Sequence, residues 1–335
     1  HEFLGDSVEG KDVVIIDDMI SSGESMLDTA RELKKRKANR VFVASTFGLF
    51  TNGLAAFDKA YEEGTISKIL TTNCIYQSPE LLSRPYYVNV DLSKYIALLI
   101  DSLNISHAGT YTNAEEREKK YPLLLEKNGF RIALLNYTYG TNGIAVTPPN
   151  IVNYIDTAII AKDIEVSKTL HPDAIIACMH WGIEYQSLPD KEQKFLAGWL
   201  LQKGVDHVIG SHPHVVQPIE VRTDSLTNDK HLVVYSLGNY ISNMSARRTD
   251  GGLMVKMELV KDSTVRLNNC EYSLVWTARP VQSEKKNHQL LPVNLPIELV
   301  PLKARNSLKI FTNDARSLFS KHNRGIKEYT FYKKK

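Results

Sequence analysis

The chain has 335 residues, 43% of them hydrophobic and 24% charged, which are the proportions of a soluble globular protein and allow two domains. A formal net charge of +3 is too small to indicate a nucleic-acid-binding protein. The three cysteines are too far apart in the chain for a disulfide framework or a zinc knuckle, and no apolar run approaches the ~20 residues that span a bilayer.

The first pattern of interest is a strand, a serine-rich loop and a helix. The β-branched run 13–16 predicts a buried strand, and a helix is predicted over residues 26–37. Ser25 is expected to cap this helix, with Asp28 at the capping-box position. Free backbone N–H groups at a helix start favour an anion, and serine hydroxyls add donors. The pattern therefore predicts a phosphate-binding loop, and a plain strand–helix turn with capping serines is the alternative.

The predicted ligand of this loop is a phosphorylated ribose, because two carboxylates that accept hydrogen bonds from ribose hydroxyls precede the serines. The predicted binding residues are Asp17, Asp18, Ser21, Ser22, Gly23, Glu24 and Ser25.

The run VVIIDDMISSGES, residues 13–25, resembles the phosphoribosyl-diphosphate loop of type I phosphoribosyltransferase folds. Residues 1–104 resemble the C-terminal half of ribose-phosphate pyrophosphokinase, with strands expected at 40–46, 66–71 and 86–90 and helices at 51–62 and 92–103. The resemblance implies a cytoplasmic, parallel-sheet domain of nucleotide biosynthesis that binds ribose 5-phosphate or phosphoribosyl diphosphate. It also implies that residues before His1 are missing, with the ATP-binding domain and a basic flexible loop, so no pyrophosphokinase activity is expected.

Farther along, three mostly apolar runs each end in a polar loop. Residues 174–179 end at His180, residues 205–209 lead to Ser211, His212 and His214, and residues 232–235 lead to Asn239. Ligands collect at such strand ends in α/β sheets, and imidazoles suit Zn²⁺ or Mn²⁺. We therefore predict that His180, His212 and His214 form a metal site; for each alone, a partnered structural histidine is the alternative. Glu184 and Asn239 are predicted to line the site, although Asn239 could instead belong only to a turn.

The strings HWGIEY, GSHPHVVQP and SLGNYISN in this region resemble three motifs of the CapA family, bacterial capsule and poly-γ-glutamate synthesis proteins of the calcineurin-like metallophosphatase superfamily. The resemblance runs from about Ile105 to at least Lys261, and more weakly to the end. It implies an α/β sandwich of metallophosphatase type over 105–335, with a divalent metal (Mn²⁺, Zn²⁺ or Mg²⁺), and envelope association if an anchor has been lost. The family's early metal-ligating motifs are absent before Ile105, so weak metal binding is expected.

The remaining elements of this part are predicted from local patterns. Asn128-Gly129 predicts a hairpin turn, Asn113 a helix N-cap and Gly204 a helix end. Further strands are expected at 105–109, 252–260 and 265–276, and further helices at 113–120, 162–170, 191–203 and 313–322. A layered sheet with helices on both faces is expected, with no chemistry beyond Pro301.

Three functional interpretations stay open. The chain is a CapA-like hydrolase-type domain fused to a ribose-phosphate-binding fragment, or a pyrophosphokinase remnant with an appendage, or a non-functional chimera of two genes. Residues 100–104 fit both families and no linker separates them, which favours the chimera. We expect few contacts between the two parts and an exposed strand edge in each.

Overall fold

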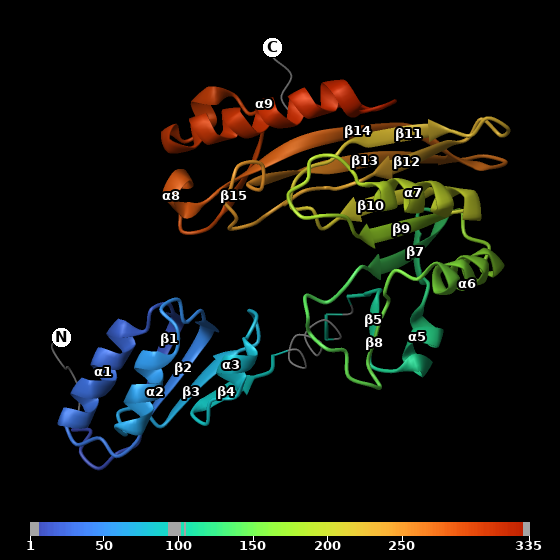
Figure 1. Ribbon diagram of the computed structural model, residues 1–335. Helices are drawn as coiled ribbons and strands as arrows, with labels where there is room; N and C mark the ends of the chain where they lie inside the picture. Colours follow the sequence, from blue (N-terminus) through green and yellow to red (C-terminus); the bar gives the residue numbers. More distant parts are fainter. Residues whose placement is uncertain (1–6, 93–101, 104, 331–335) are drawn as a thin grey trace. The chain divides into compact units, whose positions relative to one another are not determined.

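The computed structural model describes residues 7–92, 102–103 and 105–330. The chain divides into two compact units, His1–Ser106 and His107–Lys335 (Figure 1). Most of the predicted helix 92–103 and of the junction 100–104 lies outside the described residues.

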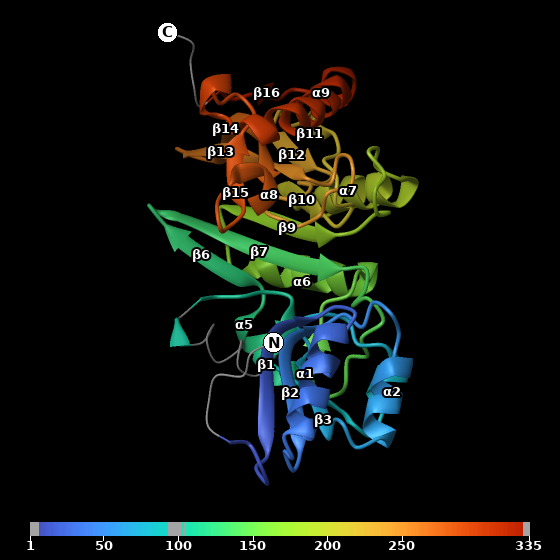
Figure 2. The same cartoon turned by 90° about the vertical axis from the view of Figure 1, so that its left-hand side faces the viewer.

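The N-terminal unit is built on a four-stranded parallel sheet in the order β1-β2-β3-β4. Each strand pairs with the next one along the chain, so α1 and α2 serve as crossover connections (Figure 2). The elements are β1 (Val13–Ile20), α1 (Glu24–Lys35), β2 (Val41–Gly48), α2 (Ala55–Glu62), β3 (Lys68–Thr72), α3 (Pro79–Leu82) and β4 (Tyr87–Val90). The parallel α/β fold class predicted for this part is confirmed.

Only one face of this sheet is packed against helices in the described residues. Leu27, Leu33 and Phe57 from α1 and α2 form the core with Val43 and Ile69. The opposite face carries exposed apolar side chains on edge strand β1, where Val14 is 54% and Ile16 82% exposed. The prediction that 13–16 is a buried strand is therefore wrong, because β-branched content reports strand propensity and not coverage of both faces.

Strand β1 is also longer than predicted. It pairs with β2 as far as Ile20, which lies opposite Gly48, so Asp17 and Asp18 belong to the strand and not to the loop. Both carboxylates are exposed, so they do not interrupt backbone pairing. The loop itself is confined to residues 21–23.

The predicted helix N-cap is wrong as well. Helix α1 begins at Glu24 after Gly23, which has left-handed backbone geometry (φ 82°) and makes no side-chain cap. Ser25 lies within the first turn, and Asp28 forms an ion pair with Arg31 at 2.6 Å. Glycine tolerates the left-handed conformation, so the helix is entered at Gly23, two residues before the predicted serine cap.

The C-terminal unit is built on a six-stranded sheet in the order β11-β12-β10-β9-β7-β6. Strands β7, β9, β10 and β12 run parallel, and β6 and β11 are antiparallel edges. The strands are β6 (Leu123–Lys127), β7 (Phe130–Thr138), β9 (Ala174–His180), β10 (His207–Ser211), β11 (Ile219–Thr223) and β12 (Lys230–Val234). The carboxyl ends of the four parallel strands therefore share one edge of the sheet.

Several local predictions for this unit hold. The β6–β7 hairpin turns at Asn128 and Gly129, both with positive φ, and Gly204 ends a helix in left-handed geometry. Asn113 caps its helix by accepting a hydrogen bond from the Glu116 N–H. The helices are α5 (Ala114–Lys120), α6 (Thr157–Thr169) and α7 (Lys191–Lys203).

One face of the six-stranded sheet packs on α6 and α7, and the other faces a second core shared with a four-stranded sheet and α9. These outer elements are β13 (Gly251–Lys261), β14 (Val265–Ala278), α8 (Pro280–Ser283), β15 (Gln289–Pro292), two short 3₁₀ helices (Ile297–Leu299 and Leu302–Ala304), α9 (Arg305–His322) and β16 (Lys327–Glu328). The result is the predicted α/β sandwich, but the expectation of helices on both faces is wrong, because a sheet contributes most of the second face.

Three element boundaries differ from the predictions. Strand β5 is only Thr110–Tyr111, paired with β8 (Ile151–Val152), instead of 105–109. Helix α6 begins at Thr157 with Asp156 as its cap, and α9 begins at Arg305. Among the described helices, none combines the length and apolar character needed to cross a bilayer.

Candidate functional site

Side chains from four parallel strands meet at the carboxyl-terminal edge of the six-stranded sheet. Tyr139 follows β7, His180 ends β9, His212 and His214 follow β10, and Asn239 follows β12. This placement follows from the topology, because the four strands point the same way and each apolar run ends at the same level.

The three predicted imidazoles lie side by side. The ring centroids of His180 and His212 are 4.7 Å apart, and those of His212 and His214 are 6.1 Å apart. Tyr139 contacts His212 at 4.3 Å and stacks on His180 at 5.8 Å, while Tyr185 stacks on His214 at 5.8 Å. We call these five residues the imidazole cluster. Neither tyrosine was predicted from the sequence, although Tyr139 directly follows β7, the second strand of the hairpin predicted at Asn128-Gly129.

A hydrogen-bond chain fixes the tautomer of His214. The side-chain amide of Asn239 donates to the Thr249 carbonyl at 2.8 Å, so its oxygen faces the ring. That oxygen lies 3.1 Å from His214 Nδ1, which must therefore carry the proton and donate. The lone pair of neutral His214 is left on Nε2, which is how second-shell partners orient a metal-ligating histidine.

Glu184 lies on the lone-pair side of the same ring, with its Oε1 3.8 Å from His214 Nε2. With Nδ1 protonated, both of these atoms are hydrogen-bond acceptors. Two acceptors facing each other repel unless a cation or a second ring proton lies between them. The pair is therefore suited to a cation.

The backbone at the cluster is held in an unfavourable conformation. His212 (φ 106°), His214 (φ 60°) and Tyr185 (φ 66°) all lie in the left-handed region. Such residues cost about 1–3 kcal/mol each and concentrate at functional sites. Three residues of this kind therefore lie together at the imidazoles.

Burial keeps two of the imidazoles neutral. It lowers the pKa of His180, and the neighbouring His212 and His214 lower it further. Burial also lowers the pKa of His212, with Glu184 acting in the opposite direction. Neutral imidazole is the form that binds a metal.

A glycine permits the close packing beneath the cluster. The indole N–H of the buried Trp181 donates to the Tyr235 carbonyl at 2.9 Å, directly over Gly210. A Cβ at Gly210 would lie 2.1 Å from that carbonyl oxygen and 2.5 Å from the indole nitrogen. Only glycine lets β10 carry His212 and His214 past this contact.

Buried amides tie the loop that carries Glu184 to the start of α7. Gln193 completes a capping box with Asp190, and its amide donates to Gln217 at 2.9 Å. Gln217 in turn donates to the carbonyl of Gln186 at 2.8 Å. The loop is therefore anchored at the helix N-terminus and at the segment after His214.

A cavity of about 460 Å³ opens beside His180 and is lined by residues from β7, β9 and β10. Ser211 lies at its wall, 3.3 Å from His180 Nδ1. Cys178 also lines it, and burial raises the pKa of this thiol, which keeps it protonated and unreactive. The cavity therefore adjoins the imidazole edge at His180 and Ser211.

A divalent cation needs several donors that converge on one point. Within the ranges that the structure describes, no group of three or more His, Cys, Asp or Glu side chains closes around one point. The donors that face each other are His214 Nε2 and the Glu184 carboxylate. These two fit a cation whose remaining ligands are water or a substrate, since an open coordination position is typical of catalytic sites.

The N-terminal loop is shaped by Gly23. Its φ is 82°, and a Cβ there would lie 2.1 Å from Cζ of Phe57. The Glu24 N–H approaches Ser22 Oγ at 3.5 Å, at the start of α1. Asp17 and Asp18 are successive strand residues and so point to opposite faces of the sheet. The structure therefore brings together residues 21–25 but separates the two carboxylates.

Comparisons with known proteins match the two parts separately. Residues 93–244 match the family model described as bacterial capsule synthesis protein PGA_cap, and residues 2–111 match the phosphoribosyl synthetase-associated domain. The "PGA biosynthesis protein CapA" of Bacillus subtilis is 30% identical over 168 residues, which are 49% of this chain and 41% of that protein. The ribose-phosphate pyrophosphokinase of Vibrio cholerae is 34% identical over 94 residues, which are 28% of this chain and 29% of that enzyme.

A solved structure, the phosphoribosylpyrophosphate synthetase of Mycobacterium smegmatis, matches 30% of this chain and 32% of its own with a TM-score of 0.27 at 22% identity. The chain thus spans less than half of each curated relative described above. Both resemblances predicted from the motifs are confirmed: a part similar to phosphoribosyl synthetases is fused to a part similar to CapA proteins.

Proposed function

We propose that the C-terminal unit acts as a CapA-like, metal-dependent hydrolase-type domain in the synthesis of a bacterial capsule polymer. The similarity of residues 93–244 to capsule synthesis proteins supports the process. The observation that carries the chemistry is the pair of acceptors formed by His214 Nε2 and Glu184. A divalent cation, Zn²⁺ or Mn²⁺ in preference to Mg²⁺, satisfies this pair, because imidazole suits softer metals.

Each residue has a distinct role in this proposal. His214 and Glu184 hold the cation, with His180 and His212 as the nearest further donors, and Asn239 keeps the His214 lone pair on Nε2. A bound divalent cation would supply Lewis acidity toward a phosphoryl or carbonyl oxygen. Tyr139 shields one face of the imidazoles, and the cavity beside His180 admits the substrate.

Titration of the full chain with Zn²⁺, Mn²⁺ and Mg²⁺ by calorimetry tests the site. We expect weak binding with Zn²⁺ or Mn²⁺ ahead of Mg²⁺, and a loss of about tenfold or more in Zn²⁺ affinity for His214→Ala and for Glu184→Gln. His212→Ala should also lower the affinity. His171→Ala, which removes an exposed imidazole elsewhere, is the matched control. Equal affinities in all four variants would contradict the proposal.

We also propose that residues 21–25 bind the phosphate of ribose 5-phosphate or phosphoribosyl diphosphate. The similarity to ribose-phosphate pyrophosphokinases and the left-handed Gly23 at the start of α1 support this. Ribose 5-phosphate titrated into the full chain should bind at millimolar concentration, and Ser22→Ala should weaken binding relative to the exposed control Ser83→Ala. No phosphoribosyl diphosphate should form from ATP and ribose 5-phosphate, and detection of that product would overturn the inactivity expected from the sequence.

An artificial joining of two genes is the second candidate, and one observation favours it. The two family matches overlap over residues 93–111, so one short segment serves both. Amplification across the corresponding codons from source DNA discriminates the alternatives. One continuous product would show a natural fusion. Failure to amplify the junction, with each part found in a different gene, would show a chimera without a biological function of its own.

A further inference from the structure

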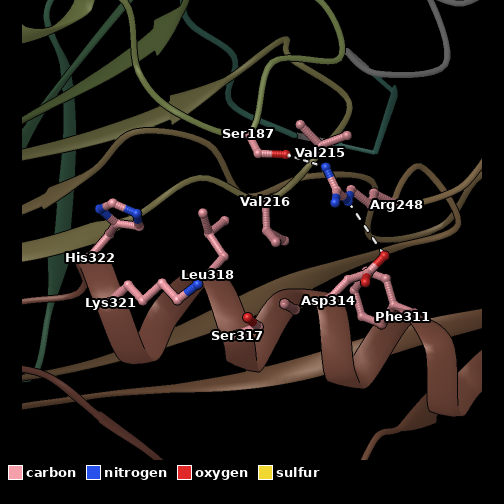
Figure 3. Close-up of a pocket in the computed structure, with 11 residues that line it drawn as sticks. Ser187, Val215, Val216, Arg248, Phe311, Asp314, Ser317, Leu318, Lys321 and His322 are labelled. Atoms are coloured by element: carbon pink, nitrogen blue, oxygen red, sulfur yellow. Dashed lines mark hydrogen bonds and ion pairs between the residues drawn. The ribbon is translucent and has the colours of Figure 1, made fainter.

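The C-terminal unit contains a second cavity, distinct from the imidazole edge. It has a volume of about 210 Å³ and lies between α9 and the loops that follow β10 and β12 (Figure 3). We call it the α9 groove. Its floor is apolar and is formed by Val215, Val216, Phe311 and Leu318. A floor of this kind fits an aliphatic segment of a ligand.

The two ends of the α9 groove carry cations. Arg248 lies at the end near Phe311 and Asp314, and Lys321 lies toward the other end, next to His322 (Figure 3). Within the described residues, no carboxylate lies within ion-pair distance of Lys321. An aliphatic floor between two cationic ends matches a ligand with an anionic group at each end.

Arg248 has donors to spare although a carboxylate is close by. Asp314 is paired with Arg247 through two short contacts of 2.7 and 2.8 Å, which hold the pKa of Asp314 below its usual range. The contact of Arg248 with Asp314 is longer, at 3.4 Å, and its other contact, to Ser187 Oγ, is also 3.4 Å. A guanidinium has five N–H donors, so most of those of Arg248 remain for a ligand.

The backbone at Arg248 gives independent support. Its φ is 74°, in the left-handed region that a non-glycine residue adopts at a cost. This conformation directs the guanidinium over the groove toward Ser187 and Asp314 (Figure 3). The strained backbone of Arg248 thus places its guanidinium at one end of the α9 groove.

We propose that the α9 groove binds a short dicarboxylate, with one carboxylate on Arg248, the other on Lys321, and the carbon chain on Val216 and Leu318. The volume corresponds to about seven water molecules, which is the size of a ligand of four to six carbons. The hydroxyls of Ser187 and Ser317 add hydrogen-bond partners for the carboxylates. The site does not depend on the metal proposed at His214.

Calorimetric titration of the full chain with glutarate tests the proposal, with pentanoate as the matched ligand that lacks one carboxylate. We expect glutarate to bind at millimolar concentration and pentanoate about tenfold more weakly, because a charge-assisted contact is lost. Arg248→Met and Lys321→Met each remove a charge and keep an aliphatic stem, and each should weaken glutarate binding about tenfold. Lys309→Met, an exposed position on the same helix, should leave binding unchanged.

Any of four results would overturn the proposal. These are equal affinity for glutarate and pentanoate, equal loss in Lys309→Met and Lys321→Met, inorganic phosphate binding as tightly as glutarate at the same residues, or no glutarate binding to a folded chain at 50 mM, roughly tenfold above the expected range. Thermal unfolding of each variant checks that it is folded.

Discussion

The two units place their candidate sites at equivalent positions on unequal sheets. In the C-terminal unit the sheet has a packed core on each face, one with α6 and α7 and one with the second sheet and α9. In the N-terminal unit only one core is present among the described residues, and Ile16 is 82% exposed on the other face. Both candidate sites nevertheless follow the carboxyl ends of parallel strands.

The comparison shows how packing on both faces of a sheet changes the side chains at its strand ends. The covered sheet holds two imidazoles, His180 and His212, whose pKa values are lowered by burial, and a third, His214, whose tautomer is set by the Asn239 amide. The half-covered sheet holds a loop of exposed or half-exposed hydroxyls, and its acidic pair is divided between two faces. We therefore expect substitutions near the first site to affect both stability and ligand binding, and substitutions near the second to act more locally.

The largest expected effect is at the covered site. Gly210→Ala places a Cβ against a backbone carbonyl and an indole that cannot both move away. We expect a loss of about 4 kcal/mol in the free energy of unfolding from overpacking and the broken Trp181 hydrogen bond. All three tryptophans lie in the C-terminal unit, so urea unfolding followed by fluorescence reports on this unit alone. Gly198→Ala within α7 is the control and should be neutral or stabilising, because the new Cβ would meet only the Arg222 side chain, at 3.9 Å.

The corresponding glycine of the half-covered unit should cost less. Gly23→Ala combines left-handed strain with a clash against the ring of the buried Phe57, a side chain that can shift more easily than the backbone carbonyl at Gly210. We expect a loss of about 3 kcal/mol. Hydrogen exchange of peptides from β2, followed by mass spectrometry, measures it without a tryptophan. A loss equal to that of Gly210→Ala would remove the distinction between the two units.

The next effect depends on pH and belongs to the covered sheet. Burial, and then nearby His231, lower the pKa of His207 to about 4, while Nδ1 accepts the Leu232 N–H at 3.1 Å. Because the folded pKa lies below the usual 6.5, the unfolded chain binds more protons between pH 6.5 and 4. Stability is complete above pH 6.5 and falls by about 2 kcal/mol at pH 5.

His207→Asn isolates this contribution, because its amide oxygen can replace Nδ1 as the acceptor but does not titrate. The variant should lose less stability than the parent chain between pH 7 and 5, by about 2 kcal/mol. Parallel pH profiles in urea unfolding would show that His207 is not the group responsible.

The smallest effect is expected on the uncovered face. Ile16→Thr should change the exchange-derived stability of the N-terminal unit by less than about 0.5 kcal/mol, because the side chain is largely exposed. Ile69→Ala on the buried side of the same sheet should cost about 2–5 kcal/mol. A comparable loss in both variants would mean that this face is covered in solution, and the contrast between the units would no longer hold.

The sequence predicted the parts of the fold that depend on local patterns. Apolar runs ending in His180 and His212 were read as strands at one sheet edge, because parallel strands bring their ends together. The Asn128 turn and the Gly204 helix end were also predictable, since each needs an unusual backbone conformation that few residues adopt.

Features set by tertiary packing could not be predicted in this way. The exposure of Ile16 depends on which helices cover its sheet. The second sheet of the C-terminal unit, built on β13 and β14, depends on pairing between residues far apart in the chain. Arg248 gave no signal, because a left-handed arginine cannot be recognised from residue type. The expectation of no chemistry beyond Pro301 considered α9 alone. The groove proposed there also needs loops earlier in the chain, and Arg248 precedes Asp314 by 66 residues.

The buried amide of Gln193 has a consequence for how the imidazole edge opens. One side chain both caps α7 and bonds to Gln217, which holds the loop that carries Glu184. Opening of the loop breaks the contact between Gln217 and Gln186 and loosens the side chain that caps α7, so we expect the loop and the first turn of α7 to open as one cooperative unit. Amide protons in the first turn of α7 should therefore exchange with solvent at the rate at which the loop opens. A cation bound between Glu184 and His214 should slow this exchange, although α7 itself does not contact the cation.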